Sequence, residues 1–328
     1  MSDHKEAKSF SRFGYIMVAA GAAIGLGNIW KFPYLAYGDG GGAFVLIYIV
    51  ICILLGHPIV QAEQAVGRRG RASAAASYGV IHPKWRFVGV INIVCTFLID
   101  IYYLVVSGWV LKYFVTYVVS GDFGKDKQAY FDNYISSTTQ PLIYSLIIIA
   151  IIVFFLFFGI TNIVEKASKV IMPMLAVLLL VCGIYALIVV PGAVDGLKYY
   201  FVPDFSKFGM QQFADACMQV CFSVGIGWGI FTTLGASMDK DANLKADAWW
   251  VDICDTFIAL LAGFVIIPTV VGTGSEMSSG PSLVFVAMTQ IFETLPGGRV
   301  IGIFFFASLI FAVISTFFTI LEIPRMYV

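Results

Sequence analysis

Apolar residues form long runs along the chain, separated by short polar segments. A helix needs about 20 mainly apolar residues to cross a bilayer core of about 30 Å, and eight runs meet that length. The runs cover 13–37, 43–65, 88–115, 141–159, 167–190, 211–238, 248–272 and 298–324. This pattern predicts an all-α, polytopic membrane protein with eight transmembrane helices.

The composition supports a membrane protein and excludes several other classes. Of the 328 residues, 59% are hydrophobic and only 12% are charged, against roughly 25% charged residues in an ordinary soluble domain. With 20 basic and 20 acidic residues the formal charge is zero, so the sequence predicts no nucleic-acid partner. All six cysteines lie within apolar runs, which favours small buried side chains over disulfides.

The distribution of Lys and Arg predicts the orientation in the membrane. Most of them fall on the side of the amino terminus, including the cluster Arg68, Arg69, Arg71, Lys84 and Arg86 between the second and third runs. The positive-inside rule then places the amino terminus in the cytoplasm and the protein in the cell (inner) membrane. The first run is too long for a secretory signal peptide, so we expect it to be a true span.

Two of the runs carry glycine clusters near their middle. The first contains Gly21, Gly25-Leu26-Gly27-Asn28 and Pro33, and the sixth contains Gly225-Ile226-Gly227-Trp228-Gly229. Such glycines either allow close helix packing or mark broken helices, and broken helices in corresponding spans are typical of inverted-repeat transporters. We therefore expect a first five-helix repeat over 1–190 and a second repeat beginning in 191–328.

An ordered set of motifs covers almost the whole chain. It comprises the segment from Ala23 to Tyr34, Gly40 to Phe44, Gly56-His57-Pro58 through Glu63 to Arg68, Tyr102-Tyr103 with Trp109, Gly159-Ile160 through Glu165-Lys166 to Pro173, and Pro203-Asp204-Phe205. Together these motifs resemble the neurotransmitter:sodium symporter family. The resemblance implies a LeuT-type inverted repeat with broken helices 1 and 6 and about eleven or twelve spans in full. Because the chain stops at Val328, its second repeat is expected to be incomplete.

The resemblance implies a sodium-coupled symporter of a small-molecule amino acid, working by alternating access, and not an enzyme. Peptide groups freed by the breaks suit a zwitterion, because exposed N–H groups can bind its carboxylate and carbonyls its ammonium group. The predicted contacts of the carboxylate are the segment Gly25-Leu26-Gly27 and the hydroxyl of Tyr103. An ordinary packed tyrosine is the alternative for Tyr103.

Two sodium sites are implied by the same resemblance. The first consists of the Ala23 carbonyl, Asn28, Ser223, Asp255 and the substrate carboxylate. The second consists of the Gly21 and Ile24 carbonyls with Ala312, Ser315 and Thr316. These ligands are hard oxygen donors, which a small cation prefers. The hydroxyls of Ser315 and Thr316 can instead bond carbonyls of their own helix.

Asp255 departs from the family pattern. Family members usually have asparagine there, and members that need chloride have a serine one turn later, where this chain has Ala259. A fixed carboxylate beside sodium supplies the negative charge that chloride otherwise brings, so we predict chloride-independent transport. Tyr48, Gln219 and Ser223 remain from the chloride site. The alternative is a structural acid paired with another side chain.

The substrate's side chain is predicted only in part. Amine-selective relatives have an aspartate where this chain has Gly25, so an amino acid is favoured over a monoamine, and Gly225 adds room in the sixth span. A hydrophobic or aromatic substrate is predicted from an apolar lining formed by Ile99, Phe222, Trp228, Phe317 and Ile320. Asp100, one turn from Tyr103, faces either a polar substrate group or a neighbouring helix.

The residues at the two gate positions match the family pattern only in part. Lys31 stands at the outer-gate position in place of an arginine, and retains the charge without the two-pronged hydrogen bonding. Glu6 and Ser9 stand where the family has its inner-gate arginine and tryptophan. Two other functions stay open: a sodium-dependent membrane amino-acid sensor without transport, and a proton-coupled relative with the same fold. The sequence does not predict the oligomeric state.

Overall fold

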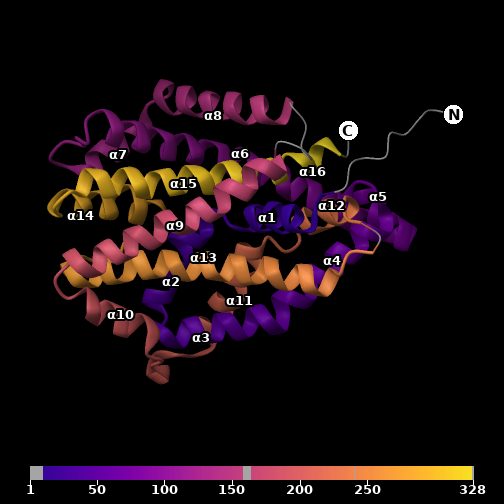
Figure 1. Cartoon of the computed structure of the whole chain (residues 1–328), viewed down its shortest axis with the longest axis horizontal. Coiled ribbons are helices and arrows are strands. Elements are labelled where there is room, and N and C mark those ends of the chain that lie inside the picture. The colour runs from indigo at the N-terminus through magenta and orange to yellow at the C-terminus, as the bar shows by residue number, and fades with distance from the viewer. Residues whose placement is uncertain (1–9, 158–163, 240, 327–328) are drawn as a thin grey trace.

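A computed structural model describes residues 10–157, 164–239 and 241–326, and within these ranges the chain is almost entirely helical, without β-strands (Figure 1). This confirms the all-α prediction. The helices are α1 Arg12–Ala23, α2 Phe32–Gly38, α3 Gly42–Ile51, α4 His57–Gly70, α5 Ala74–Ile81, α6 Arg86–Val119, α7 Lys127–Ser136, α8 Thr139–Phe157, α9 Glu165–Val189, α10 Ala193–Phe201, α11 Met210–Val224, α12 Ile230–Ala236, α13 Leu244–Thr273, α14 Met288–Thr294, α15 Gly298–Ile320 and α16 Glu322–Arg325. Short 3-10 or π-helical turns join some of them, at Gly27–Lys31 (η1), Cys52–Gly56 (η2), Pro83–Trp85 (η3), Phe205–Lys207 (η5) and Leu283–Ala287 (η6).

The helices account for the predicted membrane segments with two refinements. Five helices are long and apolar enough to cross a membrane, and two bent pairs raise that number to seven among the described residues. The segment predicted at 211–238 is not one rod, because it divides into the short helices α11 and α12. The end of the segment 141–159 lies outside the described residues beyond 157. The short apolar helix Leu283–Thr294 was not predicted.

The first span is broken at its glycine cluster, as predicted. α1 ends at Ala23, and the helical segment after the break is inclined to it by 60°. In an uninterrupted helix the Gly25 N–H would bond the Gly21 carbonyl, but here it donates to Oδ1 of Asn28 at 3.1 Å. The Gly21 carbonyl therefore loses its helical partner at the break.

The sixth span is also broken at the predicted cluster. α11 ends at Val224, and Gly225 follows in a left-handed conformation with φ 74°. Gly227 and Gly229 also have positive φ angles, which residues other than glycine rarely adopt. The segment between α11 and α12 is thus non-helical, which inside a membrane requires a protein or water lining.

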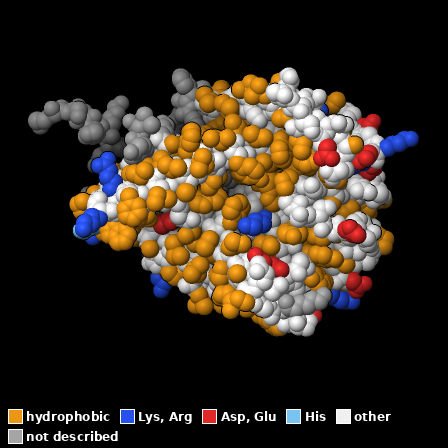
Figure 2. Space-filling model, turned by 180° about the vertical axis from the view of Figure 1, so that it is seen from behind, with side chains coloured by type: hydrophobic (Ala, Val, Ile, Leu, Met, Phe, Trp, Pro, Cys, Tyr) orange, Lys and Arg blue, Asp and Glu red, His pale blue; other side chains and the backbone are white. Residues whose placement is uncertain are grey.

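The two broken spans lie among the long helices. α1 packs against α9, α13 and α15, while α12 packs against α4. In Figure 1, α6, α9, α13 and α15 run along the longest axis of the molecule. Figure 2 shows hydrophobic side chains over much of one face, with charged side chains mainly toward its two ends. This distribution agrees with a belt of lipid around the middle of the protein.

Candidate functional site

The predicted first sodium site is a buried polar cluster between the first break, α11 and α13. The side-chain amide of Asn28 donates to Oδ1 of Asp255 at 2.7 Å and to Oγ of Ser223 at 2.9 Å. Ser223 donates to Oδ2 of Asp255 at 2.8 Å, and the Tyr48 hydroxyl donates to the same oxygen at 3.4 Å. The Asp255 side chain has no solvent exposure. Ala23, the remaining protein ligand predicted, is the last residue of α1.

The predicted second sodium site joins the same break to α15. Oγ1 of Thr316 lies 3.2 Å from the Gly21 carbonyl, 3.0 Å from the Ile24 carbonyl and 2.9 Å from the Ala312 carbonyl. The hydroxyl of Ser315 donates to the Ala312 carbonyl at 2.9 Å. A hydroxyl has one proton, so Thr316 itself donates to at most one of these three carbonyls at a time. This surplus of acceptor oxygens suits a small cation.

Tyr103 and Gly25 lie close together between the two clusters. The Tyr103 hydroxyl donates to Oγ1 of Thr316 at 3.4 Å, and a Cβ atom added to Gly25 would lie 3.3 Å from that hydroxyl. The ring of Tyr103 packs edge-on against Phe317, with centroids 5.1 Å apart. The predicted carboxylate contacts therefore lie beside both predicted sodium sites.

Part of the predicted apolar lining is also brought together. The ring of Phe222 covers Gly27 so closely that a Cβ there would lie 2.5 Å from it, and it packs edge-on against Trp228 at 5.5 Å between centroids. Ile99 is half-buried on α6, and Ile320 is fully buried at the end of α15. Leu26 is also buried.

Asp100 is buried at 7% exposure, and neither of its carboxylate oxygens has a hydrogen-bond partner among the described residues. It lies on α6 between Thr96, whose hydroxyl donates to the Trp228 carbonyl, and Tyr103. Asp100 is four residues after Thr96 and three residues before Tyr103, so all three lie on one face of α6. Thr96 contacts the sixth-span break and Tyr103 lies beside the first-span break, so this face of α6 contacts both breaks.

The gate positions have contacts that the sequence did not predict. Nζ of Lys31 lies over the Phe222 ring, 4.5 Å from its centroid. On the amino-terminal side, Nε of Arg12 pairs with Oδ1 of Asp247 at 2.8 Å. Glu6 and Ser9, the residues at the family's inner-gate positions, lie outside the described residues.

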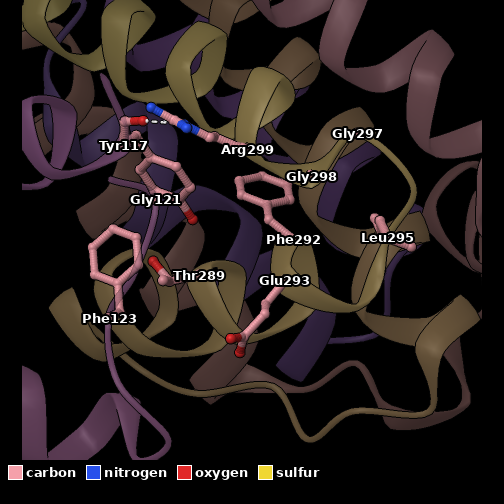
Figure 3. Close-up of a pocket in the computed structure, with 10 residues that line it drawn as sticks. All are labelled: Tyr117, Gly121, Phe123, Thr289, Phe292, Glu293, Leu295, Gly297, Gly298 and Arg299. Atoms are coloured by element: carbon pink, nitrogen blue, oxygen red, sulfur yellow. Dashed lines mark hydrogen bonds between the residues drawn. The ribbon is translucent and has the colours of Figure 1, made fainter. Parts of the chain in front are cut away.

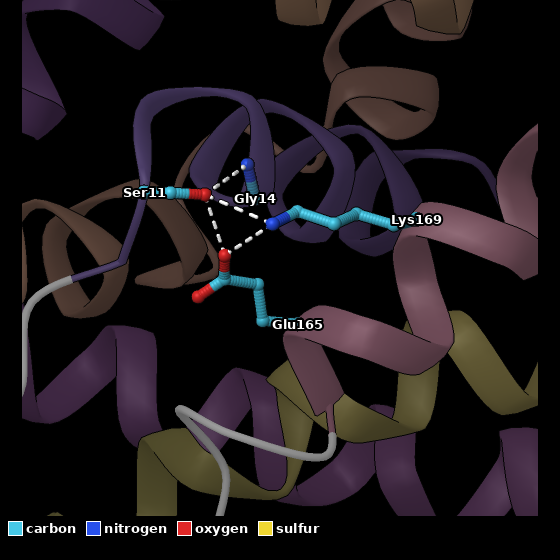
Figure 4. Close-up of polar contacts among 4 residues, drawn as sticks. All are labelled: Ser11, Gly14, Glu165 and Lys169. Atoms are coloured by element: carbon cyan, nitrogen blue, oxygen red, sulfur yellow. Dashed lines mark hydrogen bonds and ion pairs between the residues drawn. The ribbon is translucent and has the colours of Figure 1, made fainter.

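Next to Arg12, a polar triad ties the start of α1 to the start of α9. Ser11 donates to Oε1 of Glu165 at 2.5 Å, and Lys169 donates both to Ser11 at 3.0 Å and to the same carboxylate oxygen at 2.6 Å (Figure 4). Ser11 also accepts from the Gly14 N–H and so caps α1. The start of the first span is therefore fixed to both α9 and α13.

Three polar residues that support the sixth-span break were given no role by sequence reasoning. The Gly227 N–H donates to Oε1 of Glu63 at 2.8 Å, and Glu63 is 5% exposed. With its amide turned over, Asn92 donates to the Gly227 carbonyl at 2.9 Å, one turn before Thr96. An acidic residue inside a predicted membrane span is first considered functional, and the position of Glu63 in the span 43–65 could therefore have identified it.

The comparison with family models decides the family. The model described as the sodium:neurotransmitter symporter family matches residues 7–121 and 131–324. The chain belongs to the sodium:neurotransmitter symporter family.

Relatives of this symporter chain include sodium-dependent transporters from bacteria. It is 34% identical to an uncharacterized sodium-dependent transporter of Haemophilus influenzae, over 95% of this chain and 72% of the relative. It is 33% identical to the uncharacterized sodium-dependent transporter YhdH of Bacillus subtilis, over 98% and 72% of the two chains. The crystal structure of MhsT in complex with L-phenylalanine matches with a TM-score of 0.89 at 34% identity, covering 98% of this chain and 74% of MhsT.

Membership of the symporter family fixes the coarse function. The chain is a multi-pass membrane protein of a sodium-dependent transporter family that takes small molecules, and it is not an enzyme. The match to MhsT also confirms the LeuT-type fold with broken helices. The individual ligands of the sodium and substrate sites stay predictions.

A separate cavity of about 310 Å³ in the symporter lies at one end of the helices (Figure 3). It is lined by residues from the end of α6, from α14 and from the start of α15, including Tyr117, Thr289 and Glu293. Arg299, on its edge, donates to the carbonyls of Tyr117 and Val118. None of the predicted sodium or substrate residues lines this cavity.

Proposed function

We propose that the chain is a sodium-coupled symporter of an amino acid in the cell (inner) membrane, with a cytoplasmic amino terminus and two repeats divided near residue 190. The observation that carries this proposal is the shared role of Asn28. Its amide nitrogen contacts Asp255, while its amide oxygen accepts the Gly25 N–H freed by the first break. One side chain therefore contacts both the proposed cation site and the proposed carboxylate site.

This arrangement gives a physical basis for coupling. A sodium ion beside Asp255 attracts the oxygen of the Asn28 amide and repels its N–H group, so binding favours an amide turned over from the present orientation. Turning it over withdraws Oδ1 from Gly25 and frees that N–H for the substrate carboxylate. Because the carboxylate then also approaches sodium, each ligand raises the affinity of the other.

The second proposed sodium site uses the surplus of carbonyl oxygens around Thr316. An ion there would be bound by oxygens from both the first break and α15. It would therefore stabilise the contact between these two elements. Lys31 would act as the outer gate, and Arg12 with Asp247 would act on the cytoplasmic side.

The burial of Asp255 supports chloride-independent transport. Its carboxylate is already in contact with three donors, Asn28, Ser223 and Tyr48, and supplies a fixed negative charge at the proposed cation site. The position one turn later is Ala259, which has no hydroxyl for an anion. Uptake should therefore be the same in chloride and in gluconate.

A hydrophobic or aromatic amino acid fits the proposed lining best. Phe222, Trp228 and Phe317 present aromatic rings beside the two breaks. MhsT, the similar structure, was solved with L-phenylalanine bound. Asp100 adds a carboxylate with no hydrogen-bond partner among the described residues, so an aromatic side chain that carries a hydrogen-bond donor is favoured within this class.

The test is uptake of radiolabelled amino acids into proteoliposomes containing the purified chain. Transport in sodium that disappears in choline at constant pH supports sodium coupling, whereas undiminished uptake in choline supports the proton-coupled alternative. Counterflow separates a transporter from a sensor, because a sensor binds substrate without exchanging it across the membrane. Sodium-dependent binding without counterflow would therefore contradict symport by this chain.

A further inference from the structure

The cavity at one end of the helices contains two buried hydroxyl groups that have no hydrogen-bond partner among the described residues. They belong to Tyr117, in the last turn of α6, and to Thr289 on α14, and these residues are 3% and 1% exposed. Figure 3 shows both hydroxyls pointing toward the same part of the cavity. A buried hydroxyl without a partner has a desolvation cost, and a ligand in the cavity could supply the missing hydrogen bonds.

The walls around these hydroxyls are mainly aromatic. The rings of Phe123 and Phe292 line the cavity with the ring of Tyr117, and Leu295 adds an aliphatic side chain. Phe123 and Phe292 are 3% and 2% exposed. A small cavity of about 310 Å³ with apolar walls and a few polar groups is typical of a site for a small molecule. The walls therefore fit a flat, apolar body such as a single aromatic ring.

The chain itself compensates the two charged groups that line the cavity. Glu293 forms an ion pair with Lys127, the first residue of α7. Arg299 donates to the carbonyls of the last three residues of α6, at distances between 2.6 and 3.1 Å. Free carbonyls at the end of a helix carry partial negative charge, which offsets the guanidinium group. Among the described residues that line the cavity, no charge is left for an ionic ligand.

We propose that this cavity binds an uncharged aromatic molecule that carries a hydroxyl or a primary amide group. Such a group both donates and accepts hydrogen bonds, which matches two neighbouring hydroxyls. Its ring would pack among Phe123, Phe292 and Tyr117, where edge-on and offset contacts are favourable. The amino acid proposed as substrate is a zwitterion, so the ligand of this cavity belongs to another chemical class.

A ligand here would connect α6 to α14, because each helix supplies one of the two hydroxyls. α14 continues directly from η6, whose Phe285 packs edge-on against Trp30 in η1, with centroids 6.4 Å apart. A ligand that binds best to this arrangement stabilises it relative to others. Binding should therefore hold α14 near the first span and slow uptake without competing with the amino acid. This effect on uptake rests on the proposed function, whereas binding to the cavity does not.

The experiment measures binding of benzamide to the purified full chain, by ligand-observed NMR and by the shift in melting temperature. Three compounds of similar size isolate the chemistry, because toluene lacks the polar group, benzylamine is positively charged at pH 7 and benzoate is negatively charged. Benzamide should raise the melting temperature as its concentration rises. It should also bind about fivefold tighter than each of the other three, the effect of a single hydrogen bond between neutral groups.

Two variants assign binding to the cavity. Tyr117→Phe and Thr289→Val each remove one hydroxyl and keep the shape of the lining, so each should weaken benzamide binding about fivefold and leave toluene binding unchanged. Thr289→Val provides the test if Tyr117→Phe does not fold. Tyr144→Phe, at a partly buried tyrosine on α8 outside the cavity, is the matched control and should bind benzamide like the wild type.

Uptake into proteoliposomes tests the connection to α14. Saturating benzamide should lower the maximal rate of amino-acid uptake in the wild type and in Tyr144→Phe, with the KM for the amino acid unchanged. The same concentration should have a smaller effect in Thr289→Val. A raised KM would mean that benzamide occupies the substrate site, and it would contradict binding in the cavity.

Several binding results would overturn the proposed site. Equal affinities for benzamide and toluene, or no binding of benzamide, would remove the role of the hydroxyls. Benzylamine or benzoate binding as tightly as benzamide would contradict an uncharged ligand. Wild-type affinity in both hydroxyl variants would place the ligand elsewhere. Absence of amino-acid uptake under every condition would overturn the proposed function and leave these binding results as the test of the cavity.

Discussion

Asn28 donates its side-chain N–H to Oδ1 of Asp255 at 2.7 Å, and this contact joins the break in the first span to the middle of α13. The two residues are 227 positions apart in the sequence. The contact is buried, since Asn28 is 1% exposed and Asp255 has no exposure. A charge that arrives at Asp255 therefore acts directly on the segment that is proposed to bind the substrate.

Replacing Asp255 by asparagine should weaken sodium binding. The Asp255→Asn change keeps the shape but removes the fixed negative charge next to the proposed ion. We expect about a tenfold loss of sodium affinity, equivalent to about 1.4 kcal/mol, measured by radiolabelled sodium binding. Asp195→Asn, at an exposed acid on α10, is the control and should bind like the wild type. Equal affinity in Asp255→Asn and the control would place the ion elsewhere.

Thr316→Ala should also reduce sodium affinity, because it removes an oxygen that lies within 3.2 Å of two carbonyls at the first break. We expect a loss of about tenfold or more in the sodium dependence of substrate binding, since a ligand of a small cation is removed. Thr319→Ala is matched in chemistry and depth, because Thr319 is 1% exposed on the same helix and its hydroxyl has no partner among the described residues. If both variants lose the same affinity, the effect comes from helix packing and not from the site.

Asp100→Asn should change which amino acids are bound. Within the part of the chain that the structure describes, this buried carboxylate has no hydrogen-bond partner, so it favours a substrate that carries a donor, and a neutral amide reduces that preference. Competition by each of the twenty amino acids against a labelled substrate should show relatively tighter binding of purely apolar side chains. Asp132→Asn, at an exposed acid on α7, should keep the wild-type ranking. An unchanged ranking in Asp100→Asn would mean that the carboxylate faces a neighbouring helix.

Asp39, just beyond the end of α2, should make stability depend on pH. Burial, and then the nearby Asp215 carboxylate, raise the pKa of Asp39 to about 6, whereas a hydrogen bond with Gln212 lowers it. Because this pKa is higher in the folded chain than in the unfolded chain, folding is favoured while Asp39 is protonated, and that contribution is lost as the pH rises from about 4 through about 6. Asp39→Asn should therefore raise the melting temperature at pH 7.5 but not at pH 4. The same shift at both pH values would contradict a titration effect.

The helical fold and both breaks could be predicted from the sequence because they depend on local features. Apolar runs of sufficient length indicate spans, and glycine clusters such as Gly225 to Gly229 indicate where a span is interrupted. The helix Leu283–Thr294 was missed because its apolar stretch is too short to be read as a span. Periodicity alone does not separate such short runs from other buried segments.

The site could be predicted only as far as its motifs extend. The motif around Gly25 and Asn28 predicted a ligand cluster, but the bond from the Gly25 N–H to Asn28 depends on the local backbone path at the break. The pairing of His57 with Asp252 was not predicted, since these residues are 195 positions apart and meet only because α4 packs on α13. Long-range pairs of this kind depend on helix packing, which one sequence does not show.

Sodium and an amino acid are proposed to bind next to each other at the first break, where each raises the affinity of the other. The most direct test of this coupling is the sodium affinity of the purified chain, measured with and without a saturating amino acid found in the uptake screen. We predict that the amino acid raises sodium affinity by about 5- to 150-fold, the usual range for coupled sites, and that Asn28→Ala abolishes this increase. Sodium affinity that is the same with and without the amino acid would show that the two ligands are not coupled at the first break.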